Sequence, residues 1–124
     1  MKRCIFILAS LICATVCAGR PLPTDNEVAW SKWIAEEMGG EAEARLPDGT
    51  RVDVLTSSHA WEVEWAAPQK HYEAFGQACY YGIWTDKAPG VIMLQRSNED
   101  IKGVLKCKIL CARYNVRLKV VDVR

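Results

Sequence analysis

The sequence is poor in the residues and patterns that most directly indicate a function. It has two histidines among 124 residues, and its cysteines show no zinc-ligand spacing. No internal repeat, linker or low-complexity segment interrupts it, and 16 basic side chains nearly balance 15 acidic ones. These absences exclude a zinc finger, a repeat protein and a scaffold that binds nucleic acid through its overall charge. The length suits one domain with a modest core.

The longest apolar run lies at the N-terminus and falls short of the roughly 20 residues that a comfortable membrane span needs. Lys2 and Arg3 precede it, it covers residues 4–16, and Ala18 offers a small residue at a cleavage point. We interpret residues 1–18 as a secretory signal peptide, with an uncleaved anchor as the alternative. Residues 19–124 are then one exported domain, periplasmic or secreted, without stable membrane insertion.

Three cysteines and almost no net charge remain after this segment. Without Lys2 and Arg3, the 16 basic residues become 14 against 15 acidic ones. Cys79, Cys107 and Cys111 remain, and a spacing of four on a predicted helix is awkward for an unstrained disulfide between the last two. We interpret all three as buried thiols, with a long-range pair through Cys79 as the alternative.

Periodicity and capping residues predict one helix, three strands, and then helix, strand, helix and strand. A crossover helix between the third and fourth strands makes that pair parallel, so we expect an α/β fold with a mixed sheet flanked by helices. The expected strands are 41–46, 51–56, 59–65, 89–95 and 116–123. The expected helices begin at a capping box over Thr24 to Glu27, at Pro68 and after Ser97. The expected inward residues of the second helix are Tyr72, Phe75, Gly76, Cys79 and Ile83, and those of the third are Ile101, Val104, Leu105 and Ala112.

A central hairpin holds two acidic residues where a sheet ordinarily avoids them. With Ser57 and Ser58 as its two-residue turn, Asp53 falls directly opposite Glu62. Opposed side chains lie roughly 4.5–5.5 Å apart at Cβ, and like charges there are destabilising. The pair indicates a bound divalent cation, a shared proton or a basic neighbour, although an exposed face with tolerated charges explains it equally well.

The preceding loop extends this row of acids. Residues 47–49 have the composition of a type I turn closed by a glycine bulge. That loop places Glu43 opposite Asp53, and the next row brings Arg51 opposite Glu64. We expect Glu64 to pair with Arg51, with metal ligation as the alternative, and Glu43 to be a surface acid rather than a further carboxylate near the metal.

Four stretches together resemble a known superfamily. They are Leu46 to Asp53, Glu62-Val-Glu64, Lys70 to Gln77, and Gln77-Ala-Cys-Tyr-Tyr81. In this order, on an αβββαβ succession of elements, they are similar to the PD-(D/E)XK, or restriction-endonuclease-like, nucleases. The last stretch matches the QxxxY element of several nuclease branches.

The resemblance implies that Asp53 and Glu62 bind Mg²⁺ or Mn²⁺, since hard cations prefer carboxylate oxygens. The family's lysine position holds Glu64, a departure that removes a positive charge from the site. Lys70, at the start of the next helix, is the candidate replacement, with an ordinary solvated lysine as the alternative. Gln77 and Tyr81 could orient the nucleic acid or Lys70, or simply cover an exposed helix face, and Glu37 could be the acid that the family carries on its first helix.

The leading interpretation is a metal-dependent nuclease that hydrolyses phosphodiester bonds, with DNA favoured over RNA and a homodimer left open. The alternative is a catalytically inactive module of the same fold that binds or interacts. A third interpretation is an exported protein whose acidic row is a structural cation site. We expect His59 to be a turn residue and His71 a helix-surface residue. Most of the tryptophans are expected to lie in the core.

Overall fold

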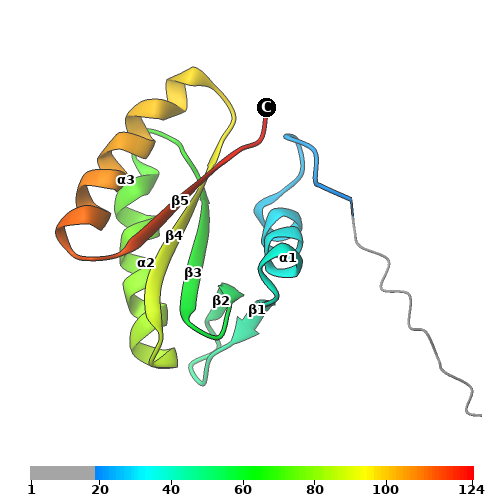
Figure 1. Cartoon of the computed structure of the whole chain (residues 1–124), viewed down its shortest axis with the longest axis vertical. Coiled ribbons are helices and arrows are strands. Elements are labelled where there is room, and N and C mark those ends of the chain that lie inside the picture. The colour runs from blue at the N-terminus through cyan, green and yellow to red at the C-terminus, as the bar shows by residue number, and fades with distance from the viewer. Residues whose placement is uncertain (1–18) are drawn as a thin grey trace, which may run out of the picture.

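The computed structural model describes residues 19–124, which form a sheet with helices on both faces (Figure 1). The predicted signal peptide lies outside the described residues. The elements are α1 (Glu27–Met38), β1 (Glu41–Arg45), β2 (Arg51–Leu55), β3 (His59–Trp65), α2 (Lys70–Thr85), β4 (Ala88–Gln95), the short 3₁₀ turn η1 (Asn98–Asp100), α3 (Ile101–Arg113) and β5 (Arg117–Asp122). No helix within residues 19–124 is long and apolar enough to cross a membrane.

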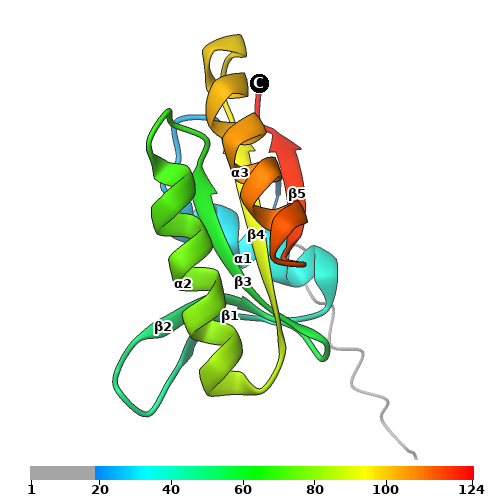
Figure 2. The ribbon, with the colours of Figure 1, turned by 90° about the vertical axis from the view of Figure 1, so that its left-hand side faces the viewer.

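The five strands follow one another across the sheet in sequence order. β1, β2 and β3 pair antiparallel, whereas β3, β4 and β5 pair parallel through the crossovers that α2 and α3 make. The helices separate by face: α2 and α3 lie side by side on one face and α1 lies on the other (Figure 2). The predicted succession of elements and the mixed α/β sheet are confirmed.

Two apolar cores lie on the two faces of the sheet. Beneath α1, the tryptophans Trp30 and Trp61 pack with Ile92 and their neighbours. Beneath α2 and α3, Val91 and Met93 pack against small helix residues. Consecutive residues of β4 therefore enter opposite cores, which explains the continuous apolar run that predicted a strand covered on both sides.

The two hairpin loops set the register of the antiparallel strands. The backbone N–H of Leu46 donates to the carbonyl of Thr50 over 2.8 Å, and Gly49 takes a φ of +88°, which glycine adopts readily. In the second loop the N–H of Thr56 donates to the carbonyl of His59 over 2.9 Å. Both registers are the ones predicted from the loop lengths.

The buried faces of α2 and α3 differ from the predicted ones. The residues of α2 that are buried are His71, Ala74, Ala78 and Tyr81, and those of α3 are Gly103, Cys107 and Cys111. By contrast, Tyr72 is 69% exposed and Ile83 is 79% exposed. Small side chains let these helices lie close to the sheet: a Cβ on Gly103 would come within 2.7 Å of the Ala67 carbonyl oxygen. Residue size, not hydrophobicity alone, therefore decides which face packs.

The cysteines in the described part of the chain are free thiols. Cys107 and Cys111 are buried with their sulfurs 3.7 Å apart, and Cys79 is partly buried. The sulfur–sulfur distance is that of a weak hydrogen bond, so the interpretation of these residues as thiols is confirmed for the described chain, and the alternative pair through Cys79 does not form.

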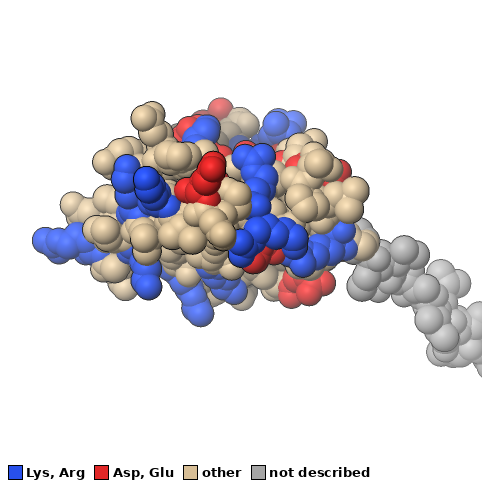
Figure 3. All heavy atoms as spheres, turned by 90° about the horizontal axis from the view of Figure 1, so that it is seen from above, with Lys and Arg blue, Asp and Glu red and all other residues tan. Residues whose placement is uncertain are grey.

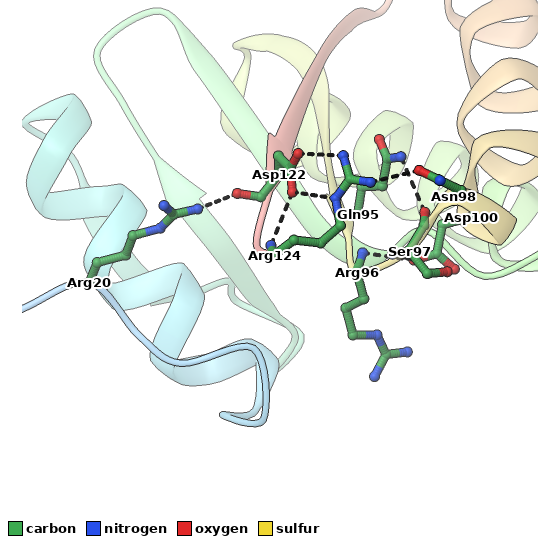
Figure 4. A network of polar contacts seen from close by, with 8 residues as sticks. All are labelled: Arg20, Gln95, Arg96, Ser97, Asn98, Asp100, Asp122 and Arg124. Carbon is green, nitrogen blue, oxygen red and sulfur yellow. Dashed lines mark hydrogen bonds and ion pairs between the residues drawn. The ribbon is translucent and has the colours of Figure 1, made fainter.

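A polar network closes the end of the molecule at which β4 and β5 finish (Figure 4). Arg124 pairs with the Asp122 carboxylate at 2.6 Å and donates to Asn98 Oδ1 at 2.6 Å. Arg20 donates to the Asp122 carbonyl oxygen from the N-terminal segment. The Arg124 charge and its hydrogen bonds lower the pKa of Asp122 to about 2. The network ties the chain before α1 and the turn before α3 to the last strand.

We expect Gly90→Ala to destabilise the fold. A Cβ at this position in β4 would lie 2.3 Å from the nearest ring atom of buried Trp61, so the core beneath α1 would have to shift. Overpacking of this kind costs about 1–3 kcal/mol of unfolding free energy, which urea denaturation would measure.

Gly76→Ala is the matched control. Its Cβ would meet open space, and alanine in a helix interior should raise the stability by about 0.5–1 kcal/mol. Equal stabilities of the two variants would contradict the packing.

Candidate functional site

The candidate site lies where β2 turns away from β3. The pairs Leu55–Ala60 and Val54–Trp61 are the last in their ladder, and the same register puts Asp53 opposite Glu62. There the Asp53 carboxylate accepts in place of a backbone carbonyl of β2: the backbone N–H of Val63 donates to its Oδ2 over 2.7 Å. The predicted opposition of Asp53 and Glu62 is therefore present, on one face of the sheet.

Glu62 is a buried carboxyl in unfavourable surroundings. It is 4% exposed, and no hydrogen-bond donor in residues 19–124 reaches its Oε2. Burial first, and then the neighbouring Asp53, raises its pKa far above the ordinary value. Burial also raises the pKa of Asp53, against the N–H of Val63 and the Glu62 hydrogen bond, which lower it. Without a cation, the pair is best satisfied by one proton on Glu62 that it donates to Asp53.

A second carboxyl pair adjoins the first. Glu64 is 4% exposed and accepts from the backbone N–H of Trp65 over 2.9 Å. Its other neighbour is Glu27, in the first turn of α1, with which it shares a side-chain hydrogen bond. Burial and the Glu64 charge raise the pKa of Glu27 to about 7. The first helix thus contributes an acid, but the acid is Glu27.

Glu37, the predicted acid of this helix, is exposed in the last turns of α1 and is not part of the cluster. The residues before Glu27 predicted a capping box in which the Glu27 side chain would be used. Instead Asn26 is the N-cap, with its Oδ1 accepting from the N–H of Ala29 over 2.9 Å. The Glu27 carboxyl is therefore free to face β3. The signal in the sequence was Asn26, a second possible N-cap, directly before this acid.

Lys70 reaches this group of acids from the start of α2. Its Nζ lies 3.7 Å from Glu64 Oε2 and 2.9 Å from Glu73 Oε2. The Glu73 hydrogen bond and the Glu64 charge raise the pKa of Lys70. The expected pairing of Glu64 with Arg51 is wrong, because Arg51 points to the surface and pairs with Glu43 at 3.4 Å. Lys70 thus brings a positive charge from α2 to Glu64 of β3.

A row of polar side chains on α2 connects Lys70 with Glu62. Gln77 donates to Glu73 Oε1 over 3.3 Å, and the Tyr81 hydroxyl donates to Gln77 Oε1 over 3.3 Å. Tyr81 is 3% exposed, so the expectation that it covers an exposed face is wrong. Its hydroxyl is also a hydrogen-bond partner of the Glu62 carboxyl, and burial and the charges of Glu62 and Asp53 raise its pKa.

Other candidates lie apart from the site. Glu43 is half-buried and acts on Asp53 only through its charge, which helps to raise the pKa of Asp53. His71 is 2% exposed, so its prediction as a surface residue is wrong. His59 stacks on Trp61 with ring centroids 5.1 Å apart, and Trp84 is the 44%-exposed tryptophan at the end of α2.

The site has the chemistry that a divalent cation requires. The acids that meet here outnumber the one lysine: they are Glu27, Asp53, Glu62 and Glu64. Carboxylate oxygens are the preferred ligands of Mg²⁺ and Mn²⁺, and Glu62 Oε2 lacks a donor. Across residues 19–124, however, no three acidic, histidine or cysteine side chains converge tightly enough to enclose an ion as they stand. The protein would therefore supply two carboxylates, with water or a phosphate completing the coordination.

Comparisons of the chain with family models, with curated proteins and with solved structures found no match.

We expect Glu62→Gln to stabilise the metal-free protein near pH 7 and to leave it unchanged near pH 4. A folded-state pKa above the ordinary 4.5 means that this carboxyl's contribution is fully present below about pH 4.5. It is then lost as the pH rises, by at most about 1.4 kcal/mol per pH unit, because the unfolded carboxyl ionises first. Glutamine remains neutral and can still donate to Asp53. Urea denaturation of both proteins in chelator across this range measures the difference.

Glu37→Gln is the control for this comparison, since the exposed Glu37 carboxylate has no buried partner to repel. Comparing variants at each pH also removes the opposite trend from His59 and His71, whose pKa values are lowered by burial. A stability gain for Glu62→Gln that is the same near pH 4 and pH 7 would show that the carboxyl is not held protonated.

Proposed function

We propose that this protein is a metal-dependent nuclease with a restriction-endonuclease-like core, which hydrolyses phosphodiester bonds of nucleic acid. The observation that carries the proposal is the Asp53–Glu62 pair on β2 and β3, with Lys70 of α2 reaching the adjoining acid Glu64. These groups come from β2, β3 and α2, and each would have a role in the reaction.

The fold supports the proposal through the position of the site. The paired residues of β2 and β3 end at Val54–Trp61, so the edge of β3 that carries the buried Glu62 and Glu64 has no strand partner beyond Trp61. The first turns of α1 and α2 reach the same edge with Glu27 and Lys70. A helix N-terminus carries a partial positive charge, which favours anionic groups near it. The edge can therefore accept a phosphodiester despite its acids, provided that a cation neutralises them.

Asp53 and Glu62 would hold Mg²⁺ or Mn²⁺, whose charge would polarise the scissile phosphate, lower the pKa of an attacking water and offset charge on the leaving oxygen. Binding the ion requires Glu62 to release its proton, so affinity should rise with pH. Tyr81 orients the Glu62 carboxyl through its hydroxyl. Gln77 and Glu73 continue this support to Lys70.

Lys70 supplies the positive charge that Glu64 cannot. The Lys70 side chain is 44% exposed and its Nζ is held between Glu64 and Glu73, so it can contact a phosphate without leaving its position at the start of α2. An ammonium on a four-carbon stem acts as a movable point charge. In this arrangement Glu64 holds Lys70 toward the site, which gives a physical role to the acid at the family's lysine position.

One observation favours the second candidate function, an inactive module of the same fold. The Lys70 ammonium is closer to Glu73 than to Glu64, and it could remain in that surface pair when nucleic acid binds. The protein would then bind a cation and nucleic acid without cleavage. DNA remains favoured over RNA as the ligand in either case.

We expect Mn²⁺- or Mg²⁺-dependent cleavage of nucleic acid that Asp53→Asn and Lys70→Met each reduce by at least about a hundredfold. Asp53→Asn removes a metal ligand, and Lys70→Met removes the positive charge while keeping most of the stem. The assay follows supercoiled DNA, linear duplex DNA, single-stranded DNA and RNA on gels, with and without chelator. Glu37→Gln, on the exposed side of α1, should cleave as the unchanged protein does.

The three possible results separate the candidate functions. Cleavage that both site variants abolish supports the nuclease. Metal-dependent binding without cleavage of any substrate rejects the nuclease and supports the binding module. Cleavage that persists in Asp53→Asn rejects this site altogether.

We expect Mn²⁺ to raise the thermal unfolding midpoint, and more so near pH 8 than near pH 5. A ligand that binds only the folded state stabilises it by mass action, and a lower proton concentration favours the ionised Glu62 that the ion needs. Glu62→Gln should remove the shift, whereas Glu43→Gln, whose acid pairs with Arg51, should keep it. Scanning fluorimetry with the intrinsic tryptophans measures the midpoints. An equal shift in Glu62→Gln would place the ion elsewhere.

A further inference from the structure

α3 carries a second apolar face, directed away from the core. Ile101, Leu105 and Ile109 recur every four residues and so share one side of the helix. They are 42%, 53% and 70% exposed. The buried residues of α3 lie two positions further along, on the opposite side: they are Gly103, Cys107 and Cys111. The exposed stripe is therefore no part of the packing that holds α3 on the sheet.

The flanks of this stripe are positively charged. Lys102, Lys106 and Arg113 border one side and Lys108 the other, and all four are exposed. No acidic residue occurs between Ile101 and Arg113. We call Ile101, Leu105 and Ile109, together with these four basic residues, the α3 outer face.

The acids that precede α3 lie away from the middle of this face. Of the acids before the helix, Asp100 is tied to the backbone N–H groups of Arg96 and Ser97, and Glu99 lies at the far end of the stripe. Seen from above, the rim on the α3 side shows blue and tan side chains and no red ones (Figure 3).

The geometry points to an anionic lipid bilayer as the partner of the α3 outer face. A helix with an apolar stripe between lysines binds in the plane of the lipid interface, where the apolar side chains enter the acyl region and the lysines extend to the head groups. A second copy of the chain is disfavoured, because pairing α3 with α3 would set lysine against lysine. Nucleic acid would use the charges and leave the isoleucines and leucine exposed.

A shallow hollow beside the stripe fits the same partner. It lies between α2 and α3, and its lining residues are His71, Tyr72, Lys106, Ile109 and Leu110. The lining is mostly apolar and includes the basic Lys106. This combination suits an acyl chain lying below an anionic head group.

The test is flotation of the full chain with vesicles of phosphatidylcholine mixed with phosphatidylglycerol, and with vesicles of phosphatidylcholine alone. We expect binding to the mixed vesicles and much weaker binding to the neutral ones. Leu105→Ser with Ile109→Ser should abolish it, because both side chains leave the acyl region. Lys102→Gln with Lys106→Gln should weaken it about fivefold for each lysine neutralised. Circular dichroism checks that the variants are folded, as we expect because the substituted side chains are exposed.

The controls lie on α1, on the opposite face of the sheet. Val28→Ser removes an apolar side chain that is 41% exposed there, and Lys32→Gln removes an exposed lysine; both should bind as the unchanged protein does. No binding to the mixed vesicles, or binding that the neutral vesicles match, overturns the inference. Binding that depends on the lysines but survives Leu105→Ser with Ile109→Ser also overturns it, and assigns the face to an acidic macromolecule instead.

Discussion

The hydrogen bond from the Val63 N–H to the Asp53 carboxylate decides the shape of the centre of the molecule. Where an antiparallel ladder would continue with a backbone carbonyl, a side chain has taken the acceptor's place, and β2 is free to leave β3. The bond works best with Asp53 ionised, because a carboxylate is the stronger acceptor. That requirement leaves Glu62 to carry the proton, in keeping with the burial and the Asp53 charge that raise the pKa of Glu62.

The departure of β2 has consequences for the helices. It leaves the edge of β3 without a strand partner beyond Trp61, and polar groups from the starts of α1 and α2 approach that edge. Glu27 reaches Glu64 from one side and Lys70 reaches it from the other. Glu27 and Lys70, together with the strand acids Asp53, Glu62 and Glu64, thus form a polar seam at this edge, and the helices that cover the two cores contribute Glu27 and Lys70 to it.

The parts of this arrangement that follow from local rules could be predicted from the sequence. The lengths of the two hairpin loops set the registers that bring Glu43, Asp53 and Glu62 into one row. The face of α2 could not be predicted in the same way, because the small Ala74 and Ala78 are fully buried and the large apolar Ile83 is 79% exposed. Ranking helix faces by hydrophobicity favours large side chains, whereas close packing on a sheet favours small ones.

Longer-range partners were the least predictable feature. The Glu64 partner depends on how far β2 diverges, since a ladder that continued would have set Arg51 opposite it, and in its absence Lys70 is nearer. Glu27 depends on whether Thr24 or Asn26 caps α1, and a shift of the cap by two residues turns the carboxyl from the backbone to β3. Small local choices therefore determine which charges meet across the sheet.

A buried carboxyl pair lowers the stability of the metal-free protein, and the fold offsets this elsewhere. β4 is buried on both faces, and three tryptophans carry cations over their rings: Arg20 over Trp30, Arg96 over Trp65 and Lys119 over Trp61. These contacts stabilise the fold without neutralising the acids of the seam, because none of these cations is a hydrogen-bond or ion-pair partner of Asp53 or Glu62. The charge at the edge of β3 is thus left for a ligand from solution to neutralise, and under the proposed function a cation that arrives with a phosphate would do so.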